Sequence, residues 1–248
     1  MINILILHCP ACYGTLNIPI TLTSTLFKTY EISTNYNYAY GSNLKGQINS
    51  NNLSLSLIRN FKRFSLISVF PYYYIKTTGS LEDQISSLHG IDIGIRFFPV
   101  YAKFSKYRTV ISILTSYKLP IGFYIRNNQY EEIVDYLSFG SGYAFVYNKF
   151  INYGEIIYSK ALKDNDIQSD RARTISGFYY AFNKYEIGPV LNWVYQKALN
   201  SNEITLGISL GLNVFNINTN LNVHKSVYYR GSGIENDFLF EIVLRGGF

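Results

Sequence analysis

Apolar residues recur at every second position over most of this chain, which is the period of a β-strand. In 52–57 Leu alternates with Asn and Ser, and in 204–213 Ile and Leu alternate with Thr, Gly, Ser and Asn. Turn-forming Asn, Gly, Asp and Lys separate the alternating segments. Helical periodicity is almost absent, so the pattern predicts an all-β fold.

Twelve alternating segments follow one another, but three of them (150–161, 173–182 and 185–197) have mixed parity, so ten to fourteen strands fit the sequence. Short turns and longer loops alternate between most segments. This alternation is typical of an antiparallel up-and-down barrel with turns on one rim and exposed loops on the other. The barrel is predicted to span 26–248, with strands at 26–40, 52–60, 63–76, 88–98, 108–119, 136–147, 150–161, 173–182, 185–197, 203–213, 215–229 and 236–248.

Alternation alone does not say whether the apolar face points into a core or out into lipid. A barrel of about twelve strands encloses more space than small side chains fill, and the polar stripes here are rich in Gly, Ser and Asn, which favours a wet lumen. Tyr clusters at 36–40, 72–74 and 228–229 suit aromatic girdles at membrane interfaces. We therefore predict a transmembrane barrel, and the alternative is a soluble lipocalin-like barrel with its apolar face inward.

Composition limits the other classes of protein. Charged residues make up 15% of the chain and aromatic residues 17%, which excludes a disordered chain. The longest apolar run, 69–75, is far shorter than the roughly 20 residues that a membrane helix needs. The net charge is +6, but Lys and Arg are scattered and form no basic cluster, so we expect no nucleic-acid partner.

The first 25 residues lie before the predicted barrel. Residues 2–11 are mostly apolar and end on the small Ala11, which is typical of an export signal, although no Lys or Arg precedes them. We interpret 1–14 as the remnant of an export signal and 15–25 as an N-terminal extension.

Cys9 and Cys12 form a C-x-x-C pair. A structural zinc site needs four ligands, and the histidines His89 and His224 are far away in the sequence. A thioredoxin-like motif needs a βαβ context, which is absent. We therefore expect no metal and no cofactor.

The last alternating strand ends on Phe248, and Phe240, Ile242, Leu244 and Phe248 share its apolar face. This pattern resembles the C-terminal assembly signal of Gram-negative outer-membrane barrels. The resemblance implies a location in the bacterial outer membrane, with the lipids of that membrane and the barrel-assembly machinery as partners.

Phe248 at the periplasmic rim would place the short turns in the periplasm and the longer loops outside the cell. The turns are then mostly basic and the loops mostly acidic. We interpret the acidic loops as solvated, with divalent-cation bridging to lipopolysaccharide as the alternative.

Strand parity assigns charged and amide side chains to the lumen. Asp92 and Arg96 are four residues apart on one face, as are Glu241 and Arg245, which is about 13 Å at ~3.3 Å per residue. We therefore expect these charges to pair across strands. A lumen with both signs of charge selects solutes by field and width. The predicted lumen-lining residues are Asp92, Arg96, Lys118, Asn216, Asn218, Asn220, Asn222, His224, Glu241 and Arg245.

Three Gly- or Pro-containing signatures lie in the middle of the chain, at 90–97 (GIDIGIRF), 117–122 (YKLPIG) and 138–142 (SFGSG). Together they resemble the outer-membrane family named for the MetA pathway of phenol degradation. The resemblance implies a transporter or channel but no particular substrate. Our own interpretation is a channel that passes or binds small molecules, hydrophobic or aromatic ones included, through a polar lumen.

Two other functions fit a barrel. His224 and Ser226 have the His-x-Ser spacing of outer-membrane lipid hydrolases, but Val227 stands where those families have Asn. Parity also directs the pair to the lumen rather than to lipid, unless a β-bulge near Asn222 reverses it. We therefore expect no enzyme, and keep a lipid hydrolase and a purely structural barrel as alternatives.

Overall fold

The computed structural model of the chain describes 29–43, 46–79, 83–103, 107–130, 133–163, 169–197, 200–214, 217–231 and 237–247. Within these ranges no helix is long and apolar enough to cross a membrane. The predicted export signal (1–14) and extension (15–25) lie outside the described residues, as do Asn216 and Phe248.

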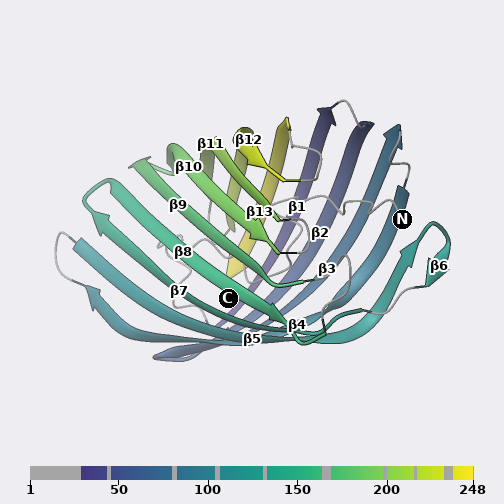
Figure 1. Cartoon of the computed structure of the whole chain (residues 1–248). Coiled ribbons are helices and arrows are strands. Elements are labelled where there is room, and N and C mark those ends of the chain that lie inside the picture. The colour runs from purple at the N-terminus through teal and green to yellow at the C-terminus, as the bar shows by residue number, and fades with distance from the viewer. Residues whose placement is uncertain are drawn as a thin grey trace.

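Twelve antiparallel strands form a closed barrel, which confirms the predicted fold class. Each strand pairs with the next along the chain, and β1 pairs with β13 to complete the ring, so the purple and yellow ends of the chain lie side by side in Figure 1. The two-residue β6 only extends the hairpin at the end of β5. The strands are β1 (Tyr30–Asn43), β2 (Gly46–Asn60), β3 (Phe64–Gly79), β4 (Asp83–Lys103), β5 (Tyr107–Arg126), β6 (Gln129–Tyr130), β7 (Tyr136–Tyr147), β8 (Phe150–Ala161), β9 (Arg171–Phe182), β10 (Tyr185–Gln196), β11 (Ser201–Val214), β12 (Ile217–Arg230) and β13 (Phe238–Gly247).

Tight turns gather at one rim of the barrel, which we call the turn rim. Asn148 and Asn183 each begin a two-residue turn with φ of 52° and 53°, a left-handed conformation that Asn tolerates better than most residues. The start of β1 and the end of β13 meet at this same rim, where Glu31 is in register with Gly247. The opposite rim, the loop rim, carries the longest connections, those after β5, β8 and β12, although β2 begins only three residues after the end of β1.

The two longest strands, β4 and β5, extend well beyond their predicted bounds of 88–98 and 108–119, and Figure 1 shows them side by side. Much of the chain that the sequence assigned to connections, at 41–51, 77–87, 98–107 and 120–135, therefore belongs to β1 through β6. The register shifts around Gly90 (φ 77°) and between Phe97 and Val100. These bulges break the two-residue period, so alternation could not reveal the strand beyond them.

Polar side chains point inward and apolar side chains point outward. On β11, Leu206, Ile208 and Leu210 are 49%, 60% and 47% exposed, whereas Thr205 and Ser209 are each 1% exposed. Large apolar side chains are exposed in the same way on most other strands. The soluble, lipocalin-like alternative is therefore wrong, because that barrel would bury these side chains and expose the polar stripes.

Aromatic side chains form a belt around the turn rim. The guanidinium of Arg59 lies 5.5 Å from the ring centroid of Tyr30, and the ammonium of Lys149 lies 5.9 Å from that of Tyr180. Rings flanked by basic groups at one level of an apolar surface are typical of a membrane interface. The exposed rings of this belt are Tyr30, Phe61, Phe64, Phe97, Tyr101, Tyr107, Phe145, Tyr147, Phe150, Tyr180, Phe182 and Tyr185.

A second group of tyrosines lies toward the loop rim and has its hydroxyls paired. The Tyr117 hydroxyl donates to Asp135 Oδ2 (2.9 Å), and the Tyr158 hydroxyl donates to Asp170 Oδ2 (2.8 Å). Each ring thus faces outward while its hydroxyl reaches a polar group nearer the loops. This amphipathic placement marks the second edge of the apolar band.

The two faces of β12 offer a direct test of this orientation. We expect Asn220→Lys to fold normally, because Asn220 and Glu186 both flank Gly211, so the new ammonium gains an acidic neighbour in the lumen. Leu221→Lys should lower the free energy of unfolding by about 2–4 kcal/mol, since it places a charge in lipid. Urea titration followed by heat-modified gel migration measures the free energy of unfolding of both variants. Equal losses of stability in Asn220→Lys and Leu221→Lys would contradict the assignment of Asn220 to the lumen and Leu221 to lipid.

Candidate functional site: the barrel lumen

The structure buries every predicted lumen residue whose side chain it describes. These side chains share the inward stripes of β4, β5, β12 and β13. Asn218 belongs to β12, but its side chain lies outside the described residues, as does the whole of Asn216. Their roles in solute passage stay predictions. The buried side chains are those of Asp92, Arg96, Lys118, Asn220, Asn222, His224, Glu241 and Arg245.

The strands that close the barrel are linked by a buried ion pair. Arg245 on β13 donates to Glu31 Oε2 on β1 through Nε (2.6 Å) and also through Nη2. Asn60 Nδ2 donates to the other carboxylate oxygen of Glu31 at 2.5 Å, and Ser65 Oγ donates to Asn60 Oδ1 at 2.6 Å. Glu31 therefore accepts hydrogen bonds at both oxygens, which offsets much of the cost of burying its charge.

A second buried ion pair crosses the interior. Arg96 Nη2 on β4 lies 2.5 Å from Glu155 Oε1 on β8, and these strands are not neighbours in the barrel. Arg173 also interacts electrostatically with Glu155, and its Nε donates to Asn192 Oδ1 at 3.0 Å. Arg96 and Arg245 thus both pair across strands, as expected, with partners that the sequence analysis did not name.

Glu241 is held by amides from the two strands that flank β13. Asn35 Nδ2 donates to its Oε1 (2.9 Å) and Asn222 Nδ2 to its Oε2 (2.7 Å). Glu241, Arg173 and the two ion pairs together form a set of three buried arginines and three buried glutamates. We call this set the charged network, and its members are Glu31, Arg96, Glu155, Arg173, Glu241 and Arg245.

Apolar side chains also project into the lumen, so the charged and amide residues predicted from the sequence are only part of its lining. One cluster combines residues of β2, β3, β5 and β8, namely Ile58, Ile67, Val69, Leu114 and Ile157. In a second cluster, Tyr153 and Tyr179 stack with centroids 5.4 Å apart and share a 2.9 Å hydrogen bond between their hydroxyls. The lumen is therefore packed with side chains at these levels and is narrow there.

The sequence analysis missed several of these residues for a physical reason. On β8 the inward stripe carries Tyr153, Glu155 and Ile157, so both faces of the strand contain apolar residues. This mixed parity hid Glu155 and, on the next strand, Arg173. Glu31 could have been found, because it lies on the polar stripe of a cleanly alternating strand.

His224 and Ser226 are both buried on the inward side of β12. The register shift of this strand lies opposite Ile204 and Thr205, beyond Ser226, so no bulge near Asn222 turns the pair toward lipid. Ser226 Oγ donates to the Tyr228 carbonyl at 3.5 Å. The pair thus faces away from the lipid substrate that a hydrolase of this kind would need.

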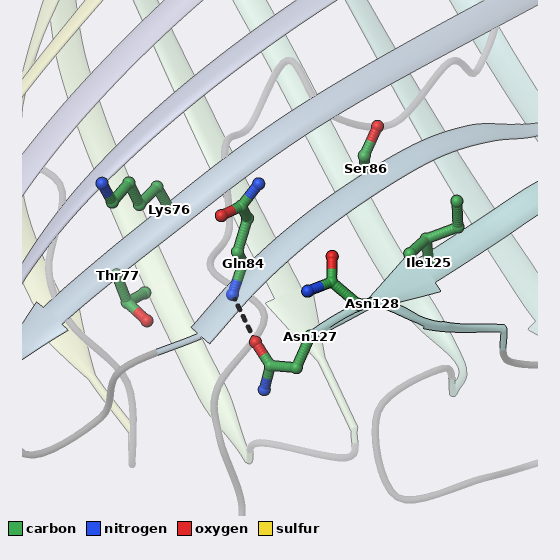
Figure 2. Close-up of a pocket in the computed structure, with 7 residues that line it drawn as sticks. All are labelled: Lys76, Thr77, Gln84, Ser86, Ile125, Asn127 and Asn128. Carbon is green, nitrogen blue, oxygen red and sulfur yellow. Dashed lines mark hydrogen bonds between the residues drawn. The ribbon is translucent and has the colours of Figure 1, made fainter.

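A pocket of about 340 Å³ lies at the loop rim between β3, β4 and β5 (Figure 2). The Gln84 backbone N–H donates to Asn127 Oδ1 at 2.9 Å, which holds the β5–β6 turn against the start of β4. Amide, hydroxyl and ammonium groups line this pocket. The outer surface is therefore polar on the loop-rim side of the second group of tyrosines. The lining residues are Lys76, Thr77, Gln84, Ser86, Ile125, Asn127 and Asn128.

A closed antiparallel barrel with an apolar, aromatic-banded outside and a charged inside is an outer-membrane β-barrel. The predicted location in a bacterial outer membrane follows from this fold and this surface.

Solved barrels of bacterial outer membranes resemble the chain in fold. An outer membrane channel from Pseudomonas putida F1 matches with a TM-score of 0.76 over 89% of this chain and 96% of that chain, at 10% identity. The transport unit of the autotransporter AIDA-I from Escherichia coli gives 0.57 over 95% of each chain, at 12% identity. The beta domain of the Bordetella autotransporter Brka gives 0.52 over 89% of this chain and 100% of that chain, at 12% identity. No protein-family model matches the chain, and no curated protein matches it in sequence.

Removing one partner of the Glu31–Arg245 pair should destabilise the barrel more than removing both. Arg245→Met leaves a buried carboxylate without its cation, and we expect a loss of about 3–5 kcal/mol in the free energy of unfolding. The double variant Glu31→Gln with Arg245→Met removes both charges and should recover most of that loss. Equilibrium unfolding in lipid vesicles measures the stabilities of the two single variants and the double variant, and Lys76→Met, on the polar outer surface at the loop rim, is the control. A double variant that loses the sum of both single effects would contradict this role.

Proposed function

We propose that this barrel is a channel that passes small solutes across the outer membrane, with the charged network as its constriction. The observation that carries the proposal is the Arg96–Glu155 pair, because it joins strands that are not neighbours and so spans part of the lumen. A solute that moves along the lumen must pass this pair. Similarity in fold to an outer membrane channel supports the same proposal.

The charge balance of the constriction supports passage of polar solutes of either sign. The network contains three arginines and three glutamates, so its own formal charges balance. Selection would then depend on width and on local hydrogen bonding. The apolar lumen residues beside the network, such as Leu114 and Ile157, would favour solutes with an apolar part.

The resemblance to the MetA-pathway family supports a transporter or channel and names no substrate. We propose that the solutes are small molecules, hydrophobic or aromatic ones included. The proposed partners are such a solute, outer-membrane lipids with lipopolysaccharide, and the barrel-assembly machinery. Phe240, Ile242 and Leu244 lie on the outward stripe of β13, which supports their proposed part in the assembly signal. Phe248 keeps its proposed role as the terminal residue of that signal.

Single-channel recording in planar bilayers tests the constriction. Removing both partners with Arg96→Ser and Glu155→Ser should raise the conductance at least about twofold, because the pair's bulk leaves the lumen while the net charge of the network stays the same. Glu155→Gln alone should shift the reversal potential toward anion preference, and Arg96→Gln toward cation preference.

The control is Lys225→Gln, which removes a cation from the outward face of β12 and should change neither property. Heat-modified migration confirms folding of each variant. A folded parent protein with no conductance and no solute uptake in vesicles would refute the channel. Unchanged selectivity in both single variants would refute the constriction.

A further inference from the structure

A second group of charged side chains lies in the lumen on the loop-rim side of the charged network. Asp92 is four residues from Arg96 along β4, about 13 Å nearer the loop rim at ~3.3 Å per residue. Tyr136 and Arg171 are the first residues of β7 and β9, which begin at that rim. We call Asp92, Lys118, Tyr136 and Arg171 the mouth cluster, because a solute that enters from the loop rim meets it before the constriction.

The register of the barrel wall brings the mouth cluster together. Asp92 is in register with Lys118 on the adjacent β5, and Lys118 is in register with Tyr136 on β7. The Lys118 ammonium lies 5.4 Å from the Tyr136 ring centroid, and the Arg171 guanidinium lies 4.2 Å from the same centroid. Both cations are therefore held beside one aromatic ring.

Two polar atoms of this cluster lack a hydrogen-bond partner among the described residues, namely Asp92 Oδ2 and Lys118 Nζ. The side chains of Asp92 and Lys118 are each only 1% exposed. Lys118 and Arg171 both interact electrostatically with Asp92, yet no hydrogen bond joins Lys118 to its register partner. A buried donor and a buried acceptor that stay unpaired are costly, so the site is suited to a ligand that satisfies both.

We propose that the mouth cluster is a binding subsite for a small organic carboxylate that also carries a hydrogen-bond donor, such as a hydroxy acid. The ligand's carboxylate accepts from Lys118 Nζ and is attracted by the Arg171 guanidinium. Its hydroxyl donates to Asp92 Oδ2. The subsite rests on the proposed function, because the lumen is the route by which a solute reaches it.

The charges of the cluster favour this ligand class over two others. Two cations and one carboxylate leave a net positive charge, which favours an anion over a neutral solute. A carboxylate without a donor would leave Asp92 Oδ2 unpaired and would also be repelled by it. The ligand with both groups is therefore expected to bind best.

Titration calorimetry on the folded protein in detergent tests the subsite with lactate, propionate and propane-1,2-diol. These probes share a three-carbon frame and carry both groups, the carboxylate only, and hydroxyls only. We expect lactate to bind about tenfold more tightly than propionate, and propane-1,2-diol to bind more weakly than either. Equal affinity for lactate and propane-1,2-diol, or no binding of lactate, would overturn the proposal.

Substitutions assign the two roles separately. Lys118→Met should weaken lactate binding at least tenfold, and Lys118→Arg should retain it, whereas Lys225→Met on the outward face of β12 should leave it unchanged. Asp92→Asn should bring the affinities for lactate and propionate to within about threefold. If Lys118→Met does not fold, Asp92→Asn and Lys118→Arg still decide the matter, because unchanged discrimination in Asp92→Asn or lost binding in Lys118→Arg overturns the proposal.

The two proposals fail in different ways. A parent protein that conducts ions but does not bind lactate would refute the subsite and leave the channel. A parent protein that binds lactate but neither conducts nor takes up solutes would refute the channel and leave a closed barrel with a binding site.

Discussion

The closure of the sheet is the constraint on which the rest of this structure depends. In a hydrocarbon environment every backbone N–H and C=O must find a partner within the protein, and a sheet meets this demand only when it has no free edge. The edges of β1 and β13 meet along a register that runs from Glu31–Gly247 to Tyr40–Phe238. The ion pair between Glu31 and Arg245, which are 214 residues apart in the sequence, lies on the lumen side of this seam. The same buried charges thus stabilise the closure and narrow the lumen.

A closed wall of this size creates an interior that must be either filled or wet. This barrel fills part of it, with ion pairs and amides at the charged network and with apolar clusters beside them. Balanced charge limits the cost of burial, because each carboxylate of the network has a cationic or amide partner. The mouth cluster differs in this respect, since Asp92 and Lys118 each retain an atom without a partner among the described residues. On our proposal, structural support and solute recognition lie at different depths of one lumen.

Alternation in the sequence predicted the strand number and the orientation of most side chains, because a lipid-facing stripe must be apolar whatever its neighbours are. It failed where the backbone departs from a simple two-residue period, as at the bulges near Gly90 and Pro99 that hid the full length of β4. It also failed where the inward face is apolar, as on β8, where Ile157 and Tyr153 concealed Glu155. The pairing partners could not be predicted at all. Arg96 and Glu155 are brought together by the curvature of the whole barrel, and no local pattern encodes that distance.

The central claim is that the apolar stripes face lipid and the charged stripes face the lumen. The chain contains a natural fluorescent probe of this claim. Trp193 is the single tryptophan of the chain, and it lies on β10 between the buried, inward-facing Asn192 and Val194. Its ring therefore belongs to the outward face. The decisive measurement is quenching of its fluorescence in vesicles by lipids brominated along their acyl chains, compared with quenching by aqueous iodide. Strong quenching by brominated lipid with little by iodide is expected. Strong quenching by iodide with none by brominated lipid would place this face toward water and contradict the account.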